Sequence, residues 1–229
     1  MRNGIVVDVG KPGPKPKRLV SETWTPKLAY AVGLLATDGC LARHVSLIDL
    51  TSNDREQLEN FCKCIGLTLH IGSKSSGFKG TTSLRVQLKN VYFYNFLKSI
   101  GLTPAKSKTI GALKIPAKYF WDFLRGSYDG DGSSYAYWDK RWRSSYMFYT
   151  DFVSASKLHI DWVREEVFSR LGIRGHITTA KGRTLFQLKY AKGDSLKLLR
   201  KMYYSRRVVC LSRKRLKIER ILATVGAKL

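Results

Sequence analysis

Two stretches of the sequence decide the fold: residues 31–39 read AVGLLATDG, and residues 124–132 read LRGSYDGDG. Each reads as a helix that ends in Asp-Gly, with a glycine, Gly33 or Gly126, five residues before the aspartate. A glycine inside a helix costs about 1 kcal/mol relative to alanine. Close packing of the two helices against each other would offset that cost.

Ala29, Gly33 and Ala36 form a stripe of small residues along one side of the first helix, because they are spaced by four and then three positions. The stripe predicts that the second helix packs against it, with Asp38 and Asp131 side by side at one end of the pair. Two neighbouring carboxylates repel each other, and a divalent cation makes such a pair favourable. An aspartate before a glycine is also common turn chemistry. Two copies at equivalent positions favour a metal or active-site role.

The predicted elements around these stretches occur in the same order twice along the chain. VQLK at residues 86–89 matches FQLK at 186–189, and IGL at 65–67 resembles LGI at 171–173. Similarity at so long a period indicates an internal duplication. Each half is predicted to be helix, two strands, helix, two strands, helix, with the joint near Pro116.

Capping residues and apolar periodicity predict helices over 26–36, 54–65, 91–100, 119–128, 156–171 and 195–203. Strands are predicted over 45–51, 68–73, 83–89, 133–138, 144–152, 175–179 and 184–190. We expect a basic flexible arm at 1–20, an N-terminal half at 21–115 and a C-terminal half at 116–229. The arm would lie along DNA phosphates or be a solvated leader.

Charge is the other strong signal, because 41 Lys and Arg against 17 Asp and Glu give the 229 residues a net charge of +24. A folded polycation most often binds a polyanion, and nucleic acid is the leading candidate. No apolar run reaches the roughly 18 residues of a transmembrane helix, and no signal-peptide pattern is present. The four cysteines are too unevenly spaced for a disulfide framework. We expect an intracellular protein, cytoplasmic or organellar, without membrane contact.

The paired stretches resemble the LAGLIDADG motif, and two copies in one chain resemble a monomeric LAGLIDADG homing endonuclease. The second copy is the closer match, whereas the first has Ala36 where the motif usually has an acidic residue. The resemblance covers roughly residues 26–222. It implies an α+β fold, a pseudo-two-fold duplicated αββαββα saddle with two antiparallel sheets and two central motif helices. The sheets of such a saddle lie in the DNA major groove.

The resemblance also implies how the paired aspartates act. Asp38 and Asp131 would bind the catalytic divalent metal ions, Mg²⁺ or Mn²⁺, and the backbone carbonyls of Thr37 and Gly130 would reach the same ions. Asp129 is expected to hold the metal-binding residues in place without binding the metal itself, or to face neighbouring backbone at the helix end.

The family often places a basic residue near each metal, and Lys106 and Lys214 match those places. A lysine there would screen charge on the scissile phosphate or orient the attacking water. An ordinary phosphate contact or a solvated surface charge is the alternative for both. A polar residue at the end of the second strand of each half is also implied, namely Ser52 or Asn53 in the first half and Asp151 in the second.

DNA readout would come from the sheets, in which alternate residues face the groove. The candidates in the first half are Arg43, Arg85, Gln87 and Lys89, and those in the second half are Arg141, Arg143, Arg183, Gln187 and Lys189. The aromatic residues between 135 and 149 would stack on bases or, more often for such a run, pack one face of a hairpin.

These features together predict a site-specific double-strand DNA endonuclease that acts as a monomer on duplex DNA. The alternative is a nucleic-acid-binding protein on the same scaffold without cleavage, an intron maturase or a transcription regulator. Relatives of that kind frequently lose one or both motif aspartates. Both aspartates are intact here, which favours the nuclease.

Overall fold

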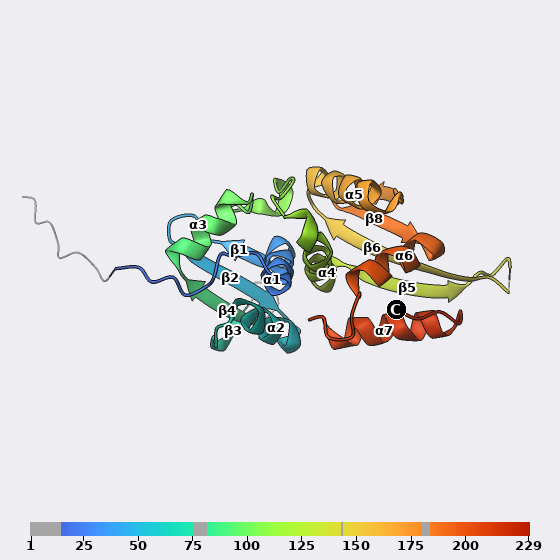
Figure 1. The fold of residues 1–229 in the computed structure, drawn as a ribbon, viewed down its shortest axis with the longest axis horizontal. Helices are drawn as coiled ribbons and strands as arrows, with labels where there is room; N and C mark the ends of the chain where they lie inside the picture. Colours follow the sequence, from blue (N-terminus) through green and yellow to red (C-terminus); the bar gives the residue numbers. More distant parts are fainter. Residues whose placement is uncertain (1–14, 76–81, 143, 180–183) are drawn as a thin grey trace, which may run out of the picture.

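The computed structural model describes four stretches of the chain: residues 15–75, 82–142, 144–179 and 184–229. Within them the chain forms two four-stranded antiparallel sheets. The helices α1 (Pro26–Thr37) and α4 (Phe120–Asp131) lie side by side between the two sheets (Figure 1). None of the helices in these stretches is both long and apolar enough to cross a membrane. Two predicted DNA contacts, Arg143 and Arg183, lie outside the described residues.

The two halves repeat one order of elements, as the duplication predicts. After α1, the first half contains β1 (Gly39–Leu41), β2 (Leu47–Ser52), α2 (Arg55–Ile65), β3 (Ile71–Ser75), β4 (Thr82–Lys89) and α3 (Val91–Ser99). After α4, the second half contains β5 (Ser133–Trp138), β6 (Tyr146–Ser154), α5 (Lys157–Leu171), β7 (His176–Thr179), β8 (Phe186–Ala191) and α6 (Lys192–Met202). The strand orders, β1-β2-β4-β3 and β5-β6-β8-β7, are equivalent. The predicted α+β saddle is confirmed.

The strand register corrects one detail of the predicted duplication. Ile71 and Ile177 each stand five residues after the glycine that ends the preceding helix. Ile71 pairs with Val86, and Ile177 pairs with Leu188. Val86 therefore corresponds to Leu188, and the predicted match with Phe186 was wrong by two residues. Because side chains alternate along a strand, a shift of two leaves every side chain on its predicted face.

From the sequence, no residue range was predicted for strand β1, which the repeat implies, or for helix α7. The strand β1 has only three residues, too few for a periodic pattern. Helix α7 (Ser212–Ala223) carries many charges, and its buried apolar side chains are confined to Ile218, Ile221 and Leu222. Their spacing fits one helical face, but the surrounding lysines and arginines obscure it.

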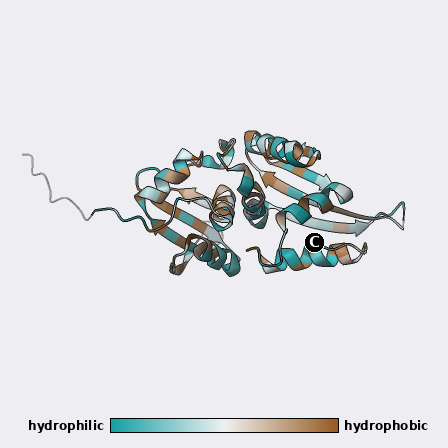
Figure 2. Ribbon diagram, in the orientation of Figure 1, coloured by the Kyte–Doolittle hydropathy of each residue, from teal (hydrophilic) through white to brown (hydrophobic). Residues whose placement is uncertain are grey.

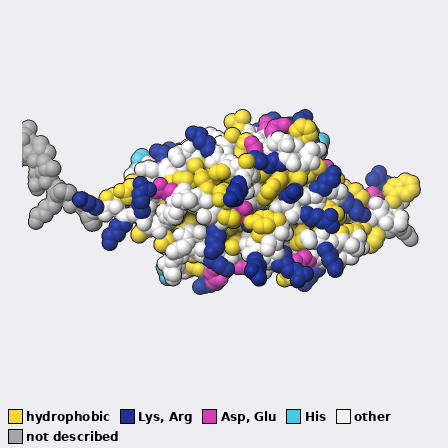
Figure 3. Space-filling view, in the orientation of Figure 1, with side chains coloured by type: hydrophobic (Ala, Val, Ile, Leu, Met, Phe, Trp, Pro, Cys, Tyr) yellow, Lys and Arg dark blue, Asp and Glu magenta, His cyan; other side chains and the backbone are white. Residues whose placement is uncertain are grey.

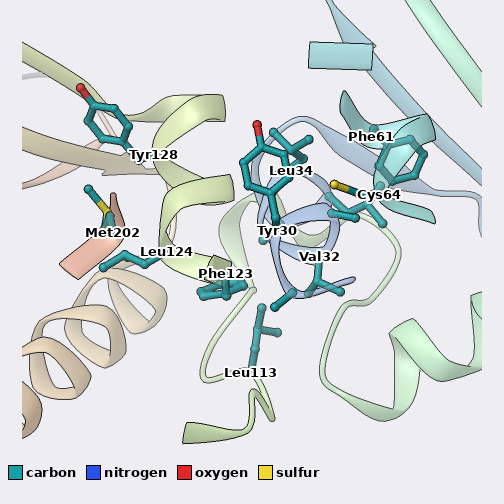
Figure 4. Close-up of a cluster of buried hydrophobic side chains, with 14 of the residues drawn as sticks. Tyr30, Val32, Leu34, Phe61, Cys64, Leu113, Phe123, Leu124, Tyr128 and Met202 are labelled. Atoms are coloured by element: carbon teal, nitrogen blue, oxygen red, sulfur yellow. The ribbon is translucent and has the colours of Figure 1, made fainter. Parts of the chain in front are cut away.

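Burial in the two central helices explains their apolar sequence. Helix α1 begins at the N-cap Thr25, whose side-chain oxygen accepts a hydrogen bond from the Leu28 backbone N–H at 3.1 Å. From Leu28 to Ala36 every residue of α1 is buried, and α1 is among the most hydrophobic elements of the ribbon (Figure 2). Side chains of both halves meet around α1 and α4 to form a continuous core (Figure 4).

The backbones of α1 and α4 come very close together where Gly33 faces Gly126. A Cβ added at Gly33 would overlap the Phe123 carbonyl oxygen, and one added at Gly126 would overlap the Tyr30 carbonyl oxygen. The obstacles are backbone atoms, which cannot turn aside as a side chain does. The predicted role of both glycines in helix packing therefore has a direct steric basis.

Gly33→Ala and Gly126→Ala should each destabilise the fold by about 1–3 kcal/mol, because even one methyl group overpacks this contact. The measurement is urea unfolding of the purified variants. Gly193→Ala is the matched control, since a Cβ at this position in α6 meets no atom within 4 Å. Equal stability of all three variants and the parent would contradict the close helix contact.

Candidate active site

The candidate site lies where α1 and α4 end together. A Cβ added at Gly130 would overlap the Thr37 hydroxyl and come within 2.9 Å of the Asp38 carboxylate oxygen Oδ2. The end of α4 is thus pressed against the end of α1. Asp38 follows α1 directly, and Asp131 is the last residue of α4. The side-by-side placement of the two aspartates, predicted from the small-residue stripe, is found in the structure.

The two carboxylates are in an environment that disfavours their charge. Desolvation by surrounding protein atoms is the main cause that raises the pKa of Asp38, and it is opposed by a hydrogen bond from Gln57 and by two nearby lysines. Desolvation also raises the pKa of Asp131, although this residue has access to solvent, and the negative charge of Asp38 raises it further. Repulsion between the carboxylates is the feature that a bound cation would relieve.

Lys106 and Lys214 are buried, with only 5% and 9% of their surfaces exposed. Lys106 donates from Nζ to the Thr37 carbonyl oxygen at the end of α1, at 3.2 Å. Lys214 donates from Nζ to three carbonyl oxygens at the end of α4, at 2.6, 3.1 and 2.7 Å, namely those of Tyr128, Gly130 and Gly132.

These contacts give the lysines a defined electrostatic role. A cation is favourable at the C-terminal end of a helix, where the last carbonyls carry partial negative charge. Burial lowers the pKa of both ammonium groups, that of Lys214 to about 8. The alternative of a solvated surface charge is therefore wrong for both lysines.

Gln57, which sequence reasoning missed, contacts the Asp38 carboxylate directly. Its Nε2 donates to Asp38 Oδ2 at 2.5 Å, and its Oε1 accepts from Ser52 Oγ at 3.1 Å. Gln57 lies in the first turn of α2 and is 3% exposed. A glutamine in the first turn of an amphipathic helix gives no sequence signal. The polar residue expected at Ser52 or Asn53 is part of this contact, as Ser52.

The segment that carries each lysine crosses to the other half of the molecule. Before Lys214, the Cys210 carbonyl oxygen accepts from Asn60 on α2 at 3.0 Å. Two further contacts join α2 to the start of α7: Arg213 with Asp54 at 2.5 Å, and Ser212 with Glu56. After Lys106, the carbonyl oxygens of Ile110 and Gly111 contact Ser156 and His159 at the start of α5. These reciprocal contacts hold both lysines in place.

Asp129 is fully buried behind the site. Its Oδ2 accepts from the Tyr30 hydroxyl and from the Leu211 backbone N–H, both at 2.7 Å. Burial raises the pKa of Asp129 to about 6 against these two hydrogen bonds. The carboxylate thus ties α4 to α1 and to the residue just before α7. Asp129 therefore holds the elements around the site together, which is the first of the two roles expected for it.

A cleft of about 550 Å³ opens beside Asp38 and Gly130. Its other walls come from the end of β2, the start of α2, Ser83 of β4 and Arg213 of α7, which is paired with Asp54. Within the described residues, no three His, Cys, Asp or Glu side chains gather into a metal cage. Asp131 does not line this cleft. A metal held between Asp38 and Asp131 would take the two carboxylates, backbone carbonyls and outside oxygens, as hard cations prefer.

The predicted DNA contacts occupy the expected faces of the sheets. Arg85, Gln87 and Lys89 of β4 alternate with the buried Val86 and Leu88. On β8, Gln187 and Lys189 alternate with the buried Leu188 and Tyr190.

Other candidates lie in turns at the ends of the sheets. Arg43 and Arg141 are exposed there, between β1 and β2 and between β5 and β6. Lys and Arg side chains are spread over the face seen in Figure 3, where acidic groups are few.

The strand register also tests the polar residues expected at the strand ends. Asp151 pairs with Lys189, as Asp49 pairs with Gln87. Asp151 thus corresponds to Asp49, and its predicted equivalence with Ser52 or Asn53 was wrong. Asp151 accepts hydrogen bonds from Ser133 and Gln187, while Asp49 accepts from Gln87 at 3.0 Å. Both aspartates therefore orient a glutamine side chain of the neighbouring strand, Gln87 or Gln187.

The aromatic residues of β5 and β6 are divided between two environments. Phe148 is buried, whereas Tyr135 stacks on Tyr149 with ring centroids 5.4 Å apart. Trp138 and Trp142 are 54% and 70% exposed near the hairpin tip. A packed face with a wet rim, the more common pattern for such a run, is what the structure contains.

No protein-family model and no curated protein matches the sequence, but solved structures match the fold. The structure is similar to the meganuclease I-SmaMI bound to uncleavable DNA, with TM-score 0.58, 13% identity, and 89% of this chain and 93% of that chain covered. It is also similar to the N-terminal LAGLIDADG domain of DUF199/WhiA, with TM-score 0.54 and 15% identity over 86% and 88% of the two chains.

A third match is I-DmoI in complex with DNA and Mn, with TM-score 0.50 and 18% identity over 79% of this chain and 98% of that one. The chain has the LAGLIDADG fold. Structural similarity at such low sequence identity establishes the fold alone. Any catalytic activity has to be inferred from the residues of the site.

Lys214→Met should destabilise this LAGLIDADG fold by roughly 1–3 kcal/mol, because buried carbonyl oxygens at the end of α4 would be left without their donor. Lys217→Met is the matched control, since Lys217 is exposed on the same helix. Urea unfolding compares the two variants. An equal, small effect of both substitutions would show that Lys214 does not stabilise the end of α4.

Proposed function

We propose that this chain is a site-specific double-strand DNA endonuclease that hydrolyses phosphodiesters with divalent metal ions held between Asp38 and Asp131. The observation that carries the proposal is the meeting of two carboxylates at adjoining helix ends, where the negative charge of Asp38 raises the pKa of Asp131. A purely structural role would not explain why Gly33 and Gly126 bring these charges together.

The donor groups fit Mg²⁺ or Mn²⁺. Asp38 and Asp131 would hold the ions with the carbonyl oxygens of Thr37 and Gly130, and water and DNA phosphate oxygens would complete the coordination. When bound, such an ion polarises the phosphoryl group and lowers the pKa of a coordinated water. The similar protein I-DmoI has been solved with DNA and Mn.

Lys106 and Lys214 would act next to the reacting phosphates. At neutral pH the Lys214 ammonium is protonated, because its pKa of about 8 lies above neutrality. It supplies a positive charge that needs no reorganisation, since its hydrogen bonds to the end of α4 already fix it. The Lys106 ammonium, held by the Thr37 carbonyl, supplies the matching charge in the other half.

Duplex DNA is the proposed partner, bound across the exposed faces of β4 and β8. The net charge of +24 favours a polyanion, and the polar side chains of these strands are spaced to reach base edges. One chain supplies both carboxylates and both sheets, so a monomer is sufficient for two-strand cleavage.

The second candidate is nucleic-acid binding without cleavage, as in a maturase or a transcription regulator. The observation that favours it is that the Lys106 and Lys214 ammonium groups already occupy the Thr37 and Gly130 carbonyls. These cations also offset part of the carboxylate charge without a metal. Cleaved sites selected from a randomised duplex library in Mg²⁺, with a parallel selection in Ca²⁺, distinguish the two candidates.

Asp38→Asn or Asp131→Asn should abolish double-strand cleavage of a selected target and leave binding within about tenfold, because metal ligands change and the sheets do not. Cleavage is measured on duplex labelled in both strands, and binding by titration in Ca²⁺. Unimpaired cleavage by the variant that carries both substitutions would refute the active-site assignment.

Target binding should weaken steeply with salt. Lys89→Ala and Lys189→Ala should each make the slope of log K against log[salt] shallower by about one unit, because each variant neutralises one phosphate fewer. Lys197→Ala is the control, because Lys197 is exposed on α6, which packs on the opposite face of the second sheet. Unchanged slopes in both sheet variants would place the DNA elsewhere.

A further inference from the structure

Helices α2 and α5 present different residues at one equivalent position near the paired carboxylates. Gln57 is the third residue after Asp54, the N-cap of α2, and His159 is the third residue after Ser156, the N-cap of α5. Both side chains are buried, at 3% and 6% exposed. The duplicated fold thus brings an amide to one half of the site and an imidazole to the other.

The Gln57 amide is held at both ends. Ser52 Oγ accepts from the Asp54 backbone N–H at 3.0 Å and donates to Gln57 Oε1 at 3.1 Å. This orientation fixes the amide so that its Nε2 donates to Asp38 Oδ2 at 2.5 Å. A carboxylate oxygen has two lone pairs, so the oxygen that accepts this bond can still coordinate a cation. Asp38 is therefore oriented before any ion binds.

His159 makes no such contact. Its Nδ1 is 2.9 Å from the Gly111 carbonyl oxygen, and burial lowers the pKa of the ring, which favours the neutral form. His159 and Asp131 line the same small cavity, of about 30 Å³. In the part of the chain that the structure describes, no hydrogen bond reaches the Asp131 carboxylate. Asp131 therefore lacks the orienting hydrogen bond that Asp38 has.

We propose that Gln57 is a positioning residue for Asp38, and that the absence of an equivalent donor at Asp131 makes the two halves of the site unequal. This inference rests on the proposed endonuclease function. It predicts that one DNA strand is cut before the other. Asp38→Asn should slow cleavage of this first strand more than cleavage of the second. Loss of a hydrogen bond to a metal ligand typically lowers metal affinity or activity by about 10–100-fold.

The test compares Gln57→Met, which keeps the size of the side chain and removes the amide, with Lys63→Met. Lys63 is exposed on the same helix and, among the described residues, has no contact with Asp38 or with the segment that carries Lys214. Ser52→Ala leaves Gln57 in place and removes the group that orients it. Thermal denaturation checks that each full-length variant is folded. Mn²⁺ binding to the free protein is measured by electron paramagnetic resonance, and cleavage is followed separately on each labelled strand.

We expect Gln57→Met to weaken Mn²⁺ binding by about tenfold or more, Ser52→Ala to weaken it less, and Lys63→Met to leave it within about twofold. On DNA, Gln57→Met should slow the first-cut strand by about 10–100-fold and the other strand far less. Equal losses of Mn²⁺ affinity in Gln57→Met and Lys63→Met, or equal slowing of both strands, would overturn the inference. A parent protein that binds Mn²⁺ in a Gln57-dependent way but cuts no selected duplex would refute the endonuclease and uphold the positioning role.

Discussion

The contact between Gly33 and Gly126 brings the backbones of α1 and α4 together, and the rest of the molecule is arranged around it. Any side chain at either position would push the helices apart and separate Asp38 from Asp131. The contact also places the two sheets on opposite sides of the α1–α4 pair, as Figure 1 shows. A single steric constraint thus sets both the geometry of the candidate site and the spacing of the two surfaces that would read DNA.

Charge that gathers at the helix ends is balanced by groups from distant parts of the chain. Each motif helix ends in carbonyl oxygens and an aspartate, and each end receives a buried lysine from a segment that contacts the other half. Breaking the interface between the halves would therefore expose the lysines and loosen the carboxylates at once. The same contacts therefore stabilise the fold and hold the residues of the candidate site. For substitutions in the site, the free energy of unfolding has to be measured together with the activity.

Much of this arrangement could be predicted from the sequence, because its signals are local and repeated. The glycine spacing, the Asp-Gly ends and the alternating polar side chains of β4 and β8 each follow from one short stretch. The register between the halves could not be predicted in the same way. The segments 86–89 and 186–189 have similar sequences, but in the structure they are offset by two residues, with Val86 equivalent to Leu188. Gln57 was missed because its role depends on the turn that Ser52 and Asp54 make, which only the folded chain displays.

A shared metal site between Asp38 and Asp131 is the feature on which the proposed chemistry depends. Anomalous diffraction at the manganese edge, from crystals of the full chain with a selected duplex and Mn²⁺, would locate the ions themselves. We expect manganese peaks between the two carboxylates, within coordination distance of both, next to the scissile phosphates. Bound duplex with no manganese at these carboxylates, and with both lysine ammonium groups contacting phosphates in its place, would contradict the shared site.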